Sequence, residues 1–251
     1  MKNVLVIVHG ETSGSEIFWQ TLISGGAYLR TVNLFKGDQL PERIHDFDGI
    51  ISLGGLMNAA DDDRCPFIKT ERAFLKKAIG ADIPVLGSSL GARLIAQACS
   101  AEISALEGTR PDWDNVLLTN TGKRDILFYG LPRSMWFPNN ESESFELPCG
   151  ATLLATSKSM PNQAFRYHNA YGLHFSIEGL SGRTTGECSK SEVLFDGKTL
   201  SDLTESFYMQ TRGIYLNFLW LADMRAKAFD SEMGSERWLI GQAEFNNWKI
   251  A

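Results

Sequence analysis

The feature that most constrains the fold is a short apolar run that ends in the pattern Gly-x-Ser-x-Gly. Residues 84–93 read Pro-Val-Leu-Gly-Ser-Ser-Leu-Gly-Ala-Arg, and a helical pattern of apolar residues follows at once. This order predicts a strand, a sharp turn at Ser89 and then a helix, because the flanking glycines permit a tight turn and close backbone approach. In such an elbow the first N–H groups of the helix can stabilise an oxyanion. The same residues could also form an ordinary strand-to-helix turn.

Strand and helix patterns alternate along the first part of the chain. Strands are expected at residues 4–8, 28–34, 50–53 and 83–86, and helices at residues 15–24 and 65–79. This alternation predicts an α/β fold with an open, mostly parallel sheet flanked by helices. Later strands, some of them antiparallel, are expected at residues 116–119, 151–156, 163–167 and 170–176. Functional groups should then gather at the carboxyl ends of the strands, where the pair Gly54-Gly55 and Ser89 both fall.

The last part of the chain has a different pattern. Residues 180–191 are rich in Gly, Ser and Thr and predict a loop or linker, whereas residues 202–229 carry the apolar stripe of a helix, with Gly213 as a point where it can bend. We therefore expect one domain over residues 1–180 and a C-terminal linker and helical extension over residues 181–251. The tail, which contains Trp238, Phe245 and Trp248, could pack on its own domain or on a partner chain, and we favour its own domain.

Composition narrows the function classes. The 251 residues have 43% hydrophobic content and a net charge of −6, which suits a compact enzyme-like domain and not a nucleic-acid-binding protein. The apolar start over residues 4–8 reads as a buried strand and not as a signal peptide, and no apolar run is long enough to span a membrane. The four cysteines are widely spaced, so we expect neither a metal site nor a disulfide framework. This cysteine usage also predicts a cytoplasmic location. We expect no cofactor.

Three segments together carry a family resemblance. Residues 47–57 form an apolar strand that ends in Gly-Gly, the Ser89 elbow follows, and residues 163–167 and 170–178 contain Gln-Ala-Phe and Ala-Tyr-Gly pieces. In this order and spacing they resemble the class I glutamine amidotransferases, especially stand-alone members similar to the amidotransferase domain of GMP synthase. The resemblance covers about residues 1–178. It implies a flavodoxin-like sheet, hydrolysis of the glutamine side-chain amide to supply ammonia and, as a possible partner, a separate synthetase subunit.

The chain departs from this family at the residues that carry the chemistry. The family's cysteine nucleophile falls on Ser89, its catalytic histidine on Ser176 and a glutamine of the elbow helix on Arg93, while the triad carboxylate is retained as Glu178. Glutamine hydrolysis by this family needs a thiolate nucleophile and a histidine base. Because both are replaced by serine, we expect no useful glutaminase activity.

Two further features follow from the resemblance. It places the oxyanion donors at the backbone N–H groups of Gly55 and Leu90. Stand-alone members also tend to carry a His-x-His pair before a Phe-x-Leu-Pro segment, but the corresponding residues 139–148 contain no histidine.

One arrangement could restore catalysis. His174 lies two residues before Ser176, and residues two apart in a strand share a face. A set of Ser89, His174 and Glu178 would make a serine-based amide or ester hydrolase. The separation along a strand, about 6.5–7 Å, argues against this set, and His174 could instead be a locally hydrogen-bonded residue.

Arg93 is the main candidate for binding. It lies one helical turn after the elbow and is either a surface residue or an anchor for an anionic group, to which a guanidinium is well suited. We assign Arg93 and Met57 to the ligand site. The expected ligand is a small glutamine-like or acidic molecule, or else a partner protein.

Overall fold

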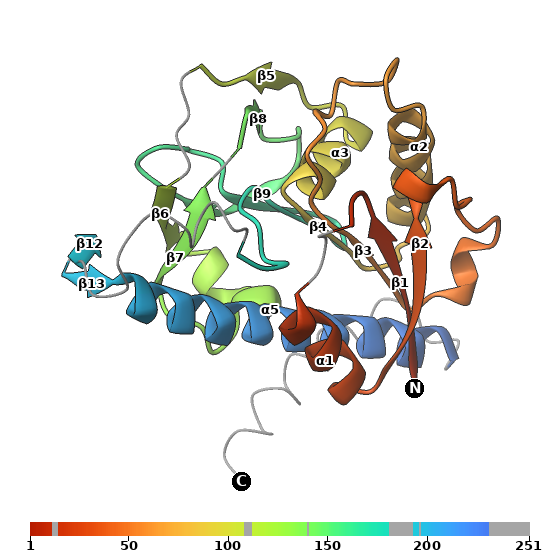
Figure 1. Cartoon of the computed structure of the whole chain (residues 1–251). Coiled ribbons are helices and arrows are strands. Elements are labelled where there is room, and N and C mark those ends of the chain that lie inside the picture. The colour runs from red at the N-terminus through yellow and green to blue at the C-terminus, as the bar shows by residue number, and fades with distance from the viewer. Residues whose placement is uncertain (12–14, 108–111, 140, 181–192, 196, 231–251) are drawn as a thin grey trace, which may run out of the picture.

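Alternating strands and helices build the molecule (Figure 1). The computed structural model describes residues 1–11, 15–107, 112–139, 141–180, 193–195 and 197–230. The strands are β1 (Lys2–Val8), β2 (Ala27–Asn33), β3 (Gly49–Ser52), β4 (Val85–Ser88), β5 (Ile103–Ala105), β6 (Asp112–Leu118), β7 (Ser134–Asn139), β8 (Glu143–Phe145), β9 (Thr152–Thr156), β10 (Ala164–Tyr167), β11 (Ala170–Leu173), β12 (Val193–Phe195) and β13 (Lys198–Thr199). The α-helices are α1 (Glu16–Ser24), α2 (Phe67–Gly80), α3 (Leu90–Ala98) and α5 (Leu200–Asp230). Short 3-10 helices occupy Leu34–Lys36, Ile44–Asp46, Gly122–Arg124 and Ile126–Phe128.

One large sheet forms the centre of the molecule. Its nine strands follow the order β2-β1-β3-β4-β11-β10-β9-β6-β7. Strands β2, β1, β3, β4 and β11 pair in parallel, whereas the pairs from β11 to β7 are antiparallel. Only β10 and β6 therefore run against the others, and the expected open, mostly parallel sheet is confirmed.

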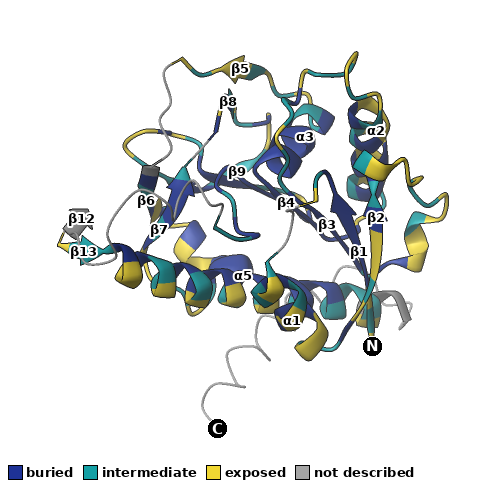
Figure 2. Ribbon diagram, viewed as in Figure 1, coloured by how far each residue is buried: buried dark blue, intermediate teal, exposed yellow. Residues whose placement is uncertain are grey.

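Strand β1 shows why the sheet is covered on both faces. Its last five residues are all apolar and buried (Figure 2), as expected for a central strand between two layers of helices. Val4, Val6 and Val8 join one hydrophobic cluster, while Leu5 and Ile7 join the other. The first cluster lies under α1 and α5, and the second lies under α2 and α3 (Figure 1).

The C-terminal helix belongs to one of these layers. Leu203, Phe207 and Phe218 of α5 are fully buried and pack in the same cluster as the valines of β1. The helix continues through Gly213, where a bend was expected; a Cβ there would come within 2.6 Å of a methyl group of Leu131. The absence of a side chain at Gly213 therefore allows α5 to pack closely against Leu131. The division at residue 180 stays a prediction, and Trp238, Phe245 and Trp248 lie outside the described residues.

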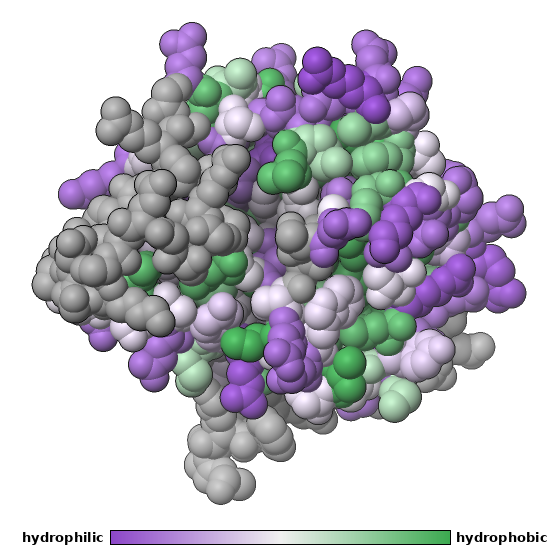
Figure 3. All heavy atoms as spheres, in the orientation of Figure 1, coloured by the Kyte–Doolittle hydropathy of each residue, from purple (hydrophilic) through white to green (hydrophobic). Residues whose placement is uncertain are grey.

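The viewed face of the molecule carries both hydrophilic and hydrophobic side chains (Figure 3). Figure 3 shows hydrophobic side chains in several separate groups among hydrophilic ones on the viewed face. Leu56, which follows the glycine pair, is fully exposed. Within the described part of the chain, no helix is both long and apolar enough to cross a membrane.

Helix α3 approaches the sheet at backbone distance. A Cβ on Gly91 would come within 2.2 Å of the carbonyl oxygen of Ser52, and a Cβ on Gly87 would come within 2.5 Å of the Gly91 backbone. The two glycines that flank Ser89 therefore let the helix lie directly against β3 and β4, as the sequence pattern predicts.

This contact predicts that Gly91→Ala is strongly destabilising. The new methyl group would meet the rigid backbone of Ser52, so we expect a loss of about 3 kcal/mol in the free energy of unfolding, measured by urea denaturation. Gly80→Ala is the matched control, because a Cβ there meets no atom within 4 Å. It should leave stability unchanged or raise it by up to about 1 kcal/mol. Equal effects of the two substitutions would contradict this account of the packing.

Candidate functional site

The turn at Ser89 has a rare backbone conformation. Ser89 has φ 53° and ψ −111° and stands between the end of β4 and the start of α3. Positive φ is uncommon for a residue with a side chain and carries strain, which persists only where the surroundings impose it. Here the Ser89 N–H donates to the carbonyl oxygen of Leu173 at 2.9 Å. The side chain is held at the carboxyl end of the sheet, as the Gly-x-Ser-x-Gly pattern predicts.

The glycine pair after β3 lies against this turn. A Cβ on Gly54 would come within 3.2 Å of the Ser89 Cβ and 3.4 Å of its Oγ. A Cβ on Gly55 would come within 2.9 Å of the Leu90 side chain and 2.7 Å of the Met57 sulfur. Among the described residues, no acceptor is recorded for the N–H of Gly55 or of Leu90. The two expected oxyanion donors are thus neighbours, and their role stays a prediction.

Ser88 ties the segment after β11 to the turn. Its hydroxyl donates to the Phe175 carbonyl at 3.2 Å and accepts from the Ile177 N–H at 3.2 Å. The phenol of Tyr215, from α5, donates to the Ile177 carbonyl on the other side. These bonds fix the positions of Ser176 and Glu178, which flank Ile177.

The carboxylate of Glu178 is occupied by donors from the protein. One oxygen accepts from the N–H of Gly54, and the other accepts from the hydroxyl of Ser176. The first of these oxygens lies 3.1 Å from the position of a Cβ on Gly54, which places it beside Ser89. The structure therefore brings Ser89, Ser176 and Glu178 together, but Glu178 orients a hydroxyl and a backbone amide instead of an imidazole.

His174 is directed elsewhere. Its ring is buried and packs near Phe145, with 5.4 Å between the ring centroids. The Nε2 atom lies 2.9 Å from the carbonyl oxygen of Glu143 and donates to it, and Nδ1 has no hydrogen-bond partner among the described residues. Burial is the main cause that lowers the pKa of His174, so the ring is neutral at pH 7. Neither nitrogen is hydrogen-bonded to Ser89 or Glu178, so the alternative triad is not assembled.

Arg93 is buried inside the protein. It is 2% exposed, its Nη1 donates to Glu141, and its Nε lies 3.2 Å from the nearer carboxylate oxygen of Glu143. That oxygen also accepts from the N–H of Ala59 at 2.8 Å. The charge of Arg93 is thus balanced within the fold. Its role as an anchor for an anionic ligand stays a prediction, and a ligand would have to compete with two carboxylates.

The sequence analysis did not identify Glu141 and Glu143 as partners of Arg93, although the sequence contains an indication of this pairing. They occupy the segment in which the family resemblance leads one to expect a His-x-His pair, and Arg93 replaces a glutamine. The structure brings these departures into contact. A buried cation that appears together with two acidic residues is the expected pattern, because an unpaired buried charge is very costly.

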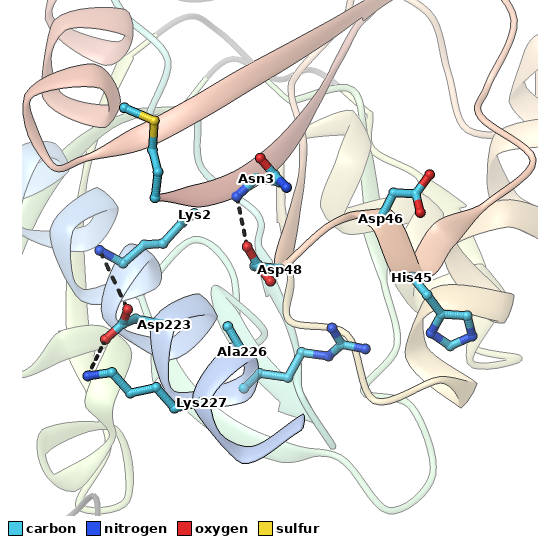
Figure 4. A pocket seen from close by; sticks show the side chains of 10 residues that line it. Lys2, Asn3, His45, Asp46, Asp48, Asp223, Ala226 and Lys227 are labelled. Atoms are coloured by element: carbon cyan, nitrogen blue, oxygen red, sulfur yellow. Dashed lines mark hydrogen bonds and ion pairs between the residues drawn. The ribbon is translucent and has the colours of Figure 1, made fainter. Parts of the chain in front are cut away.

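The surface is hollowed near both ends of β1, beside Lys2 and Asn3 at its start and beside Val8 at its end. The hollow at the start of β1 has a volume of about 580 Å³ (Figure 4), whereas Ser89 lies at the opposite, carboxyl edge of the sheet. Its charges satisfy one another: Asp223 pairs with Lys227 at 2.9 Å and with Lys2 at 4.0 Å. We regard it as a solvated ion-pair surface. Among the described residues, no group of three potential metal-ligating side chains is close enough to hold a metal ion.

The buried ion pairs predict a large effect of Arg93→Met. Glu141 and Glu143 would be left buried without a counter-charge, so we expect a loss of about 3–5 kcal/mol in the free energy of unfolding. Adding Glu141→Gln and Glu143→Gln should recover much of this loss. Arg72→Met is the control, since the Arg72–Asp62 pair at 2.6 Å is partly exposed and should contribute about 1 kcal/mol or less. A loss at Arg93 no larger than that at Arg72, in urea denaturation, would refute the assignment.

Known proteins share this fold. A glutamine amidotransferase from Thermotoga maritima superimposes with a TM-score of 0.74 at 24% identity, covering 88% of this chain and 98% of that one. A glutamine amidotransferase from Methylobacillus flagellatus gives 0.73 at 19% identity, with 88% and 95% covered. A GMP synthase subunit from Thermoplasma acidophilum gives 0.65 at 18% identity, with 92% and 98% covered. No curated protein matches the chain by sequence.

The family is shown by the sequence itself. The sequence model described as "Glutamine amidotransferase class-I" matches residues 14–175, which is more than half of the chain and includes the glycine pair, the Ser89 turn and β11. The resemblance inferred from these segments is therefore confirmed, and this chain belongs to the class I glutamine amidotransferase family.

Proposed function

We propose that this chain is a member of its family that binds a ligand at the Ser89 turn without hydrolysing glutamine. The observation that carries the proposal is the contact set of Glu178: its oxygens bond to Gly54 and Ser176, and no imidazole reaches Ser89. A serine hydroxyl is not appreciably ionised near neutral pH and needs a base to become a nucleophile. The site keeps its backbone framework and lacks the groups that move protons.

The ligand that suits this framework is glutamine-like. The N–H groups of Gly55 and Leu90 can donate to a carbonyl oxygen, and the carboxylate of Glu178 can accept from an amide –NH₂. Because Arg93 is paired with Glu141 and Glu143, an acidic ligand would meet Glu178 without a free cation from Arg93. We therefore favour an uncharged amide over a second carboxylate.

A separate partner is part of the proposal. One solved structure similar to this chain is described as one subunit of a GMP synthase, and that name implies a second subunit. The fully exposed Leu56 directly follows Gly55, where a Cβ would come within 2.9 Å of the Leu90 side chain at the turn. We propose that a synthetase-type partner protein contacts this loop in the cytoplasm. The partner would distinguish the ligand-bound state of the loop from the ligand-free state.

The alternative serine hydrolase requires a rearrangement. His174 would have to leave the Glu143 carbonyl and turn its ring towards Ser89, and Glu178 would have to leave Gly54 and Ser176. Only the strained φ of Ser89 favours this alternative, since such strain often accompanies a nucleophile. The same backbone strain is equally consistent with a turn that binds a ligand without catalysing a reaction.

Restoring the two missing groups should create activity. The wild type should release no ammonia from L-glutamine above background, and Ser89→Cys with Ser176→His should gain measurable turnover, because thiol, imidazole and Glu178 are then all present. Each single substitution should remain at least about 10³-fold below the pair, since the groups act as a unit.

Two outcomes would contradict the loss of catalysis. One is glutaminase activity in the wild type that disappears in Ser89→Ala. The other is covalent labelling of wild-type Ser89 by a fluorophosphonate that disappears in His174→Gln, which would establish the serine hydrolase instead.

Ligand choice should depend on Glu178. In calorimetric titrations we expect the wild type to prefer L-glutamine over L-glutamate by about tenfold or more, equivalent to about 1.4 kcal/mol, because two carboxylates repel each other. Glu178→Gln should narrow this preference. Absence of glutamine binding, or a preference for glutamate in the wild type, would reject the proposed ligand class.

A further inference from the structure

A buried polar chain lies directly behind the glycine pair. His9 follows the end of β1 and is 2% exposed, and Glu71 of α2 and Ser52 of β3 are fully buried. The Nε2 atom of His9 lies 2.6 Å from one carboxylate oxygen of Glu71, and the Ser52 hydroxyl donates to the other at 2.7 Å. Such a chain in the interior is costly unless it is fully paired. None of these residues belongs to the site described above.

The histidine touches the loop that carries the expected oxyanion donor. A Cβ on Gly55 would come within 2.9 Å of the His9 Cβ, while a Cβ on Gly54 would point at Ser89. The carbonyls of Gly54 and Leu53 help to raise the pKa of His9. Within the described part of the chain, His9 Nδ1 has no hydrogen-bond partner. The glycine pair is thus sandwiched between Ser89 and His9.

The surroundings of His9 determine its charge. Burial by itself would lower the pKa of His9, but the charge and hydrogen bond of Glu71, with the Gly54 and Leu53 carbonyls, raise it above the usual value. From α2, Glu71 is the charged group that faces the ring, and Phe67 stacks against it at 6.2 Å between centroids. From β3 the facing group is the neutral Ser52. The protonated form of His9 is therefore favoured beside Glu71.

We propose that His9 is a positioning residue for the glycine pair: its protonated ring, anchored by Glu71, supports the loop at Gly55, and loss of the proton weakens this anchor and releases the loop. The Gly55 N–H then loses its fixed direction towards the Ser89 turn. This control concerns the loop itself and exists whether or not a ligand binds there. The site would be ordered when His9 is charged and loose when it is neutral.

The sign of the pH dependence follows from linkage. Because the folded-state pKa of His9 is raised, its contribution to stability is fully present below the unfolded value of about 6.5 and is lost as pH rises through the folded value. Loop order should follow the same direction, with amide exchange of residues 53–57 increasing above that transition after correction for intrinsic exchange rates. The His9 ring signals in NMR should titrate over the same range.

Three variants distinguish a positioning role of His9 from a general effect on protein stability. Glu71→Gln keeps a hydrogen-bond partner but removes the charge, so both the His9 titration and the loop transition should move together to lower pH. His9→Gln should abolish the transition. His45→Gln is the control, because His45 is exposed in the 3-10 helix Ile44–Asp46 and should change neither.

The experiment uses the full chain without ligand, so failure of ligand binding does not affect it. Should His9→Gln not fold, the wild-type titration and Glu71→Gln still decide. The proposal is overturned if loop exchange is independent of pH while His9 titrates, or if Glu71→Gln shifts the His9 titration and leaves the loop transition in place.

Discussion

The close backbone contact between α3 and the sheet is the constraint on which the rest of this structure depends. Gly91 lies against Ser52, and Gly87 lies against Gly91, so the chain between them must reverse within a few residues. Ser89 adopts positive φ because it stands inside this reversal. The same contact brings the loop after β3 beside the turn, since Ser52 is the last residue of β3. Strain at Ser89 is therefore balanced by packing elsewhere, as expected for a site that is held rigid.

Electrostatics then determine the surroundings of the turn. The carboxylate of Glu178 accepts from the Ser176 hydroxyl and from the Gly54 N–H. Farther along the helix, Arg93 is neutralised by Glu141 and Glu143. Glu143 in turn binds the Ala59 N–H through its side chain and His174 through its carbonyl. Among the described residues, Arg93, Glu141, Glu143 and Glu178 each have a partner within the protein, which favours a fixed arrangement around the turn.

The sequence predicted the strands and the Ser89 turn better than the contacts between side chains that are distant in sequence. Glycine spacing and apolar runs are local signals, so the strands up to Ser88, the turn and the family were all accessible from them. Strand β7 was missed, since it pairs only with β6 and its register depends on distant residues. The pairing of Arg93 was also beyond reach, because sequence alone does not show that residues 48 positions apart meet. His9 belongs to no recognisable sequence motif. Its proposed positioning role depends on contacts that form only when β1, β3 and α2 come together in the fold.

The carboxylate of Glu178 and the ring of His9 border the glycine pair from its two sides. Glu178 accepts from the Gly54 N–H on the side of Ser89, and the His9 ring lies near the Gly54 carbonyl on the other. A peptide dipole between a carboxylate and an imidazolium is stabilised by both when its N–H faces the anion and its C=O faces the cation. Here both groups act on Gly54, the residue that also packs on Ser89. Glu178 thus bonds to the loop itself, and Gly54 connects the Ser89 side of the loop with the His9 side.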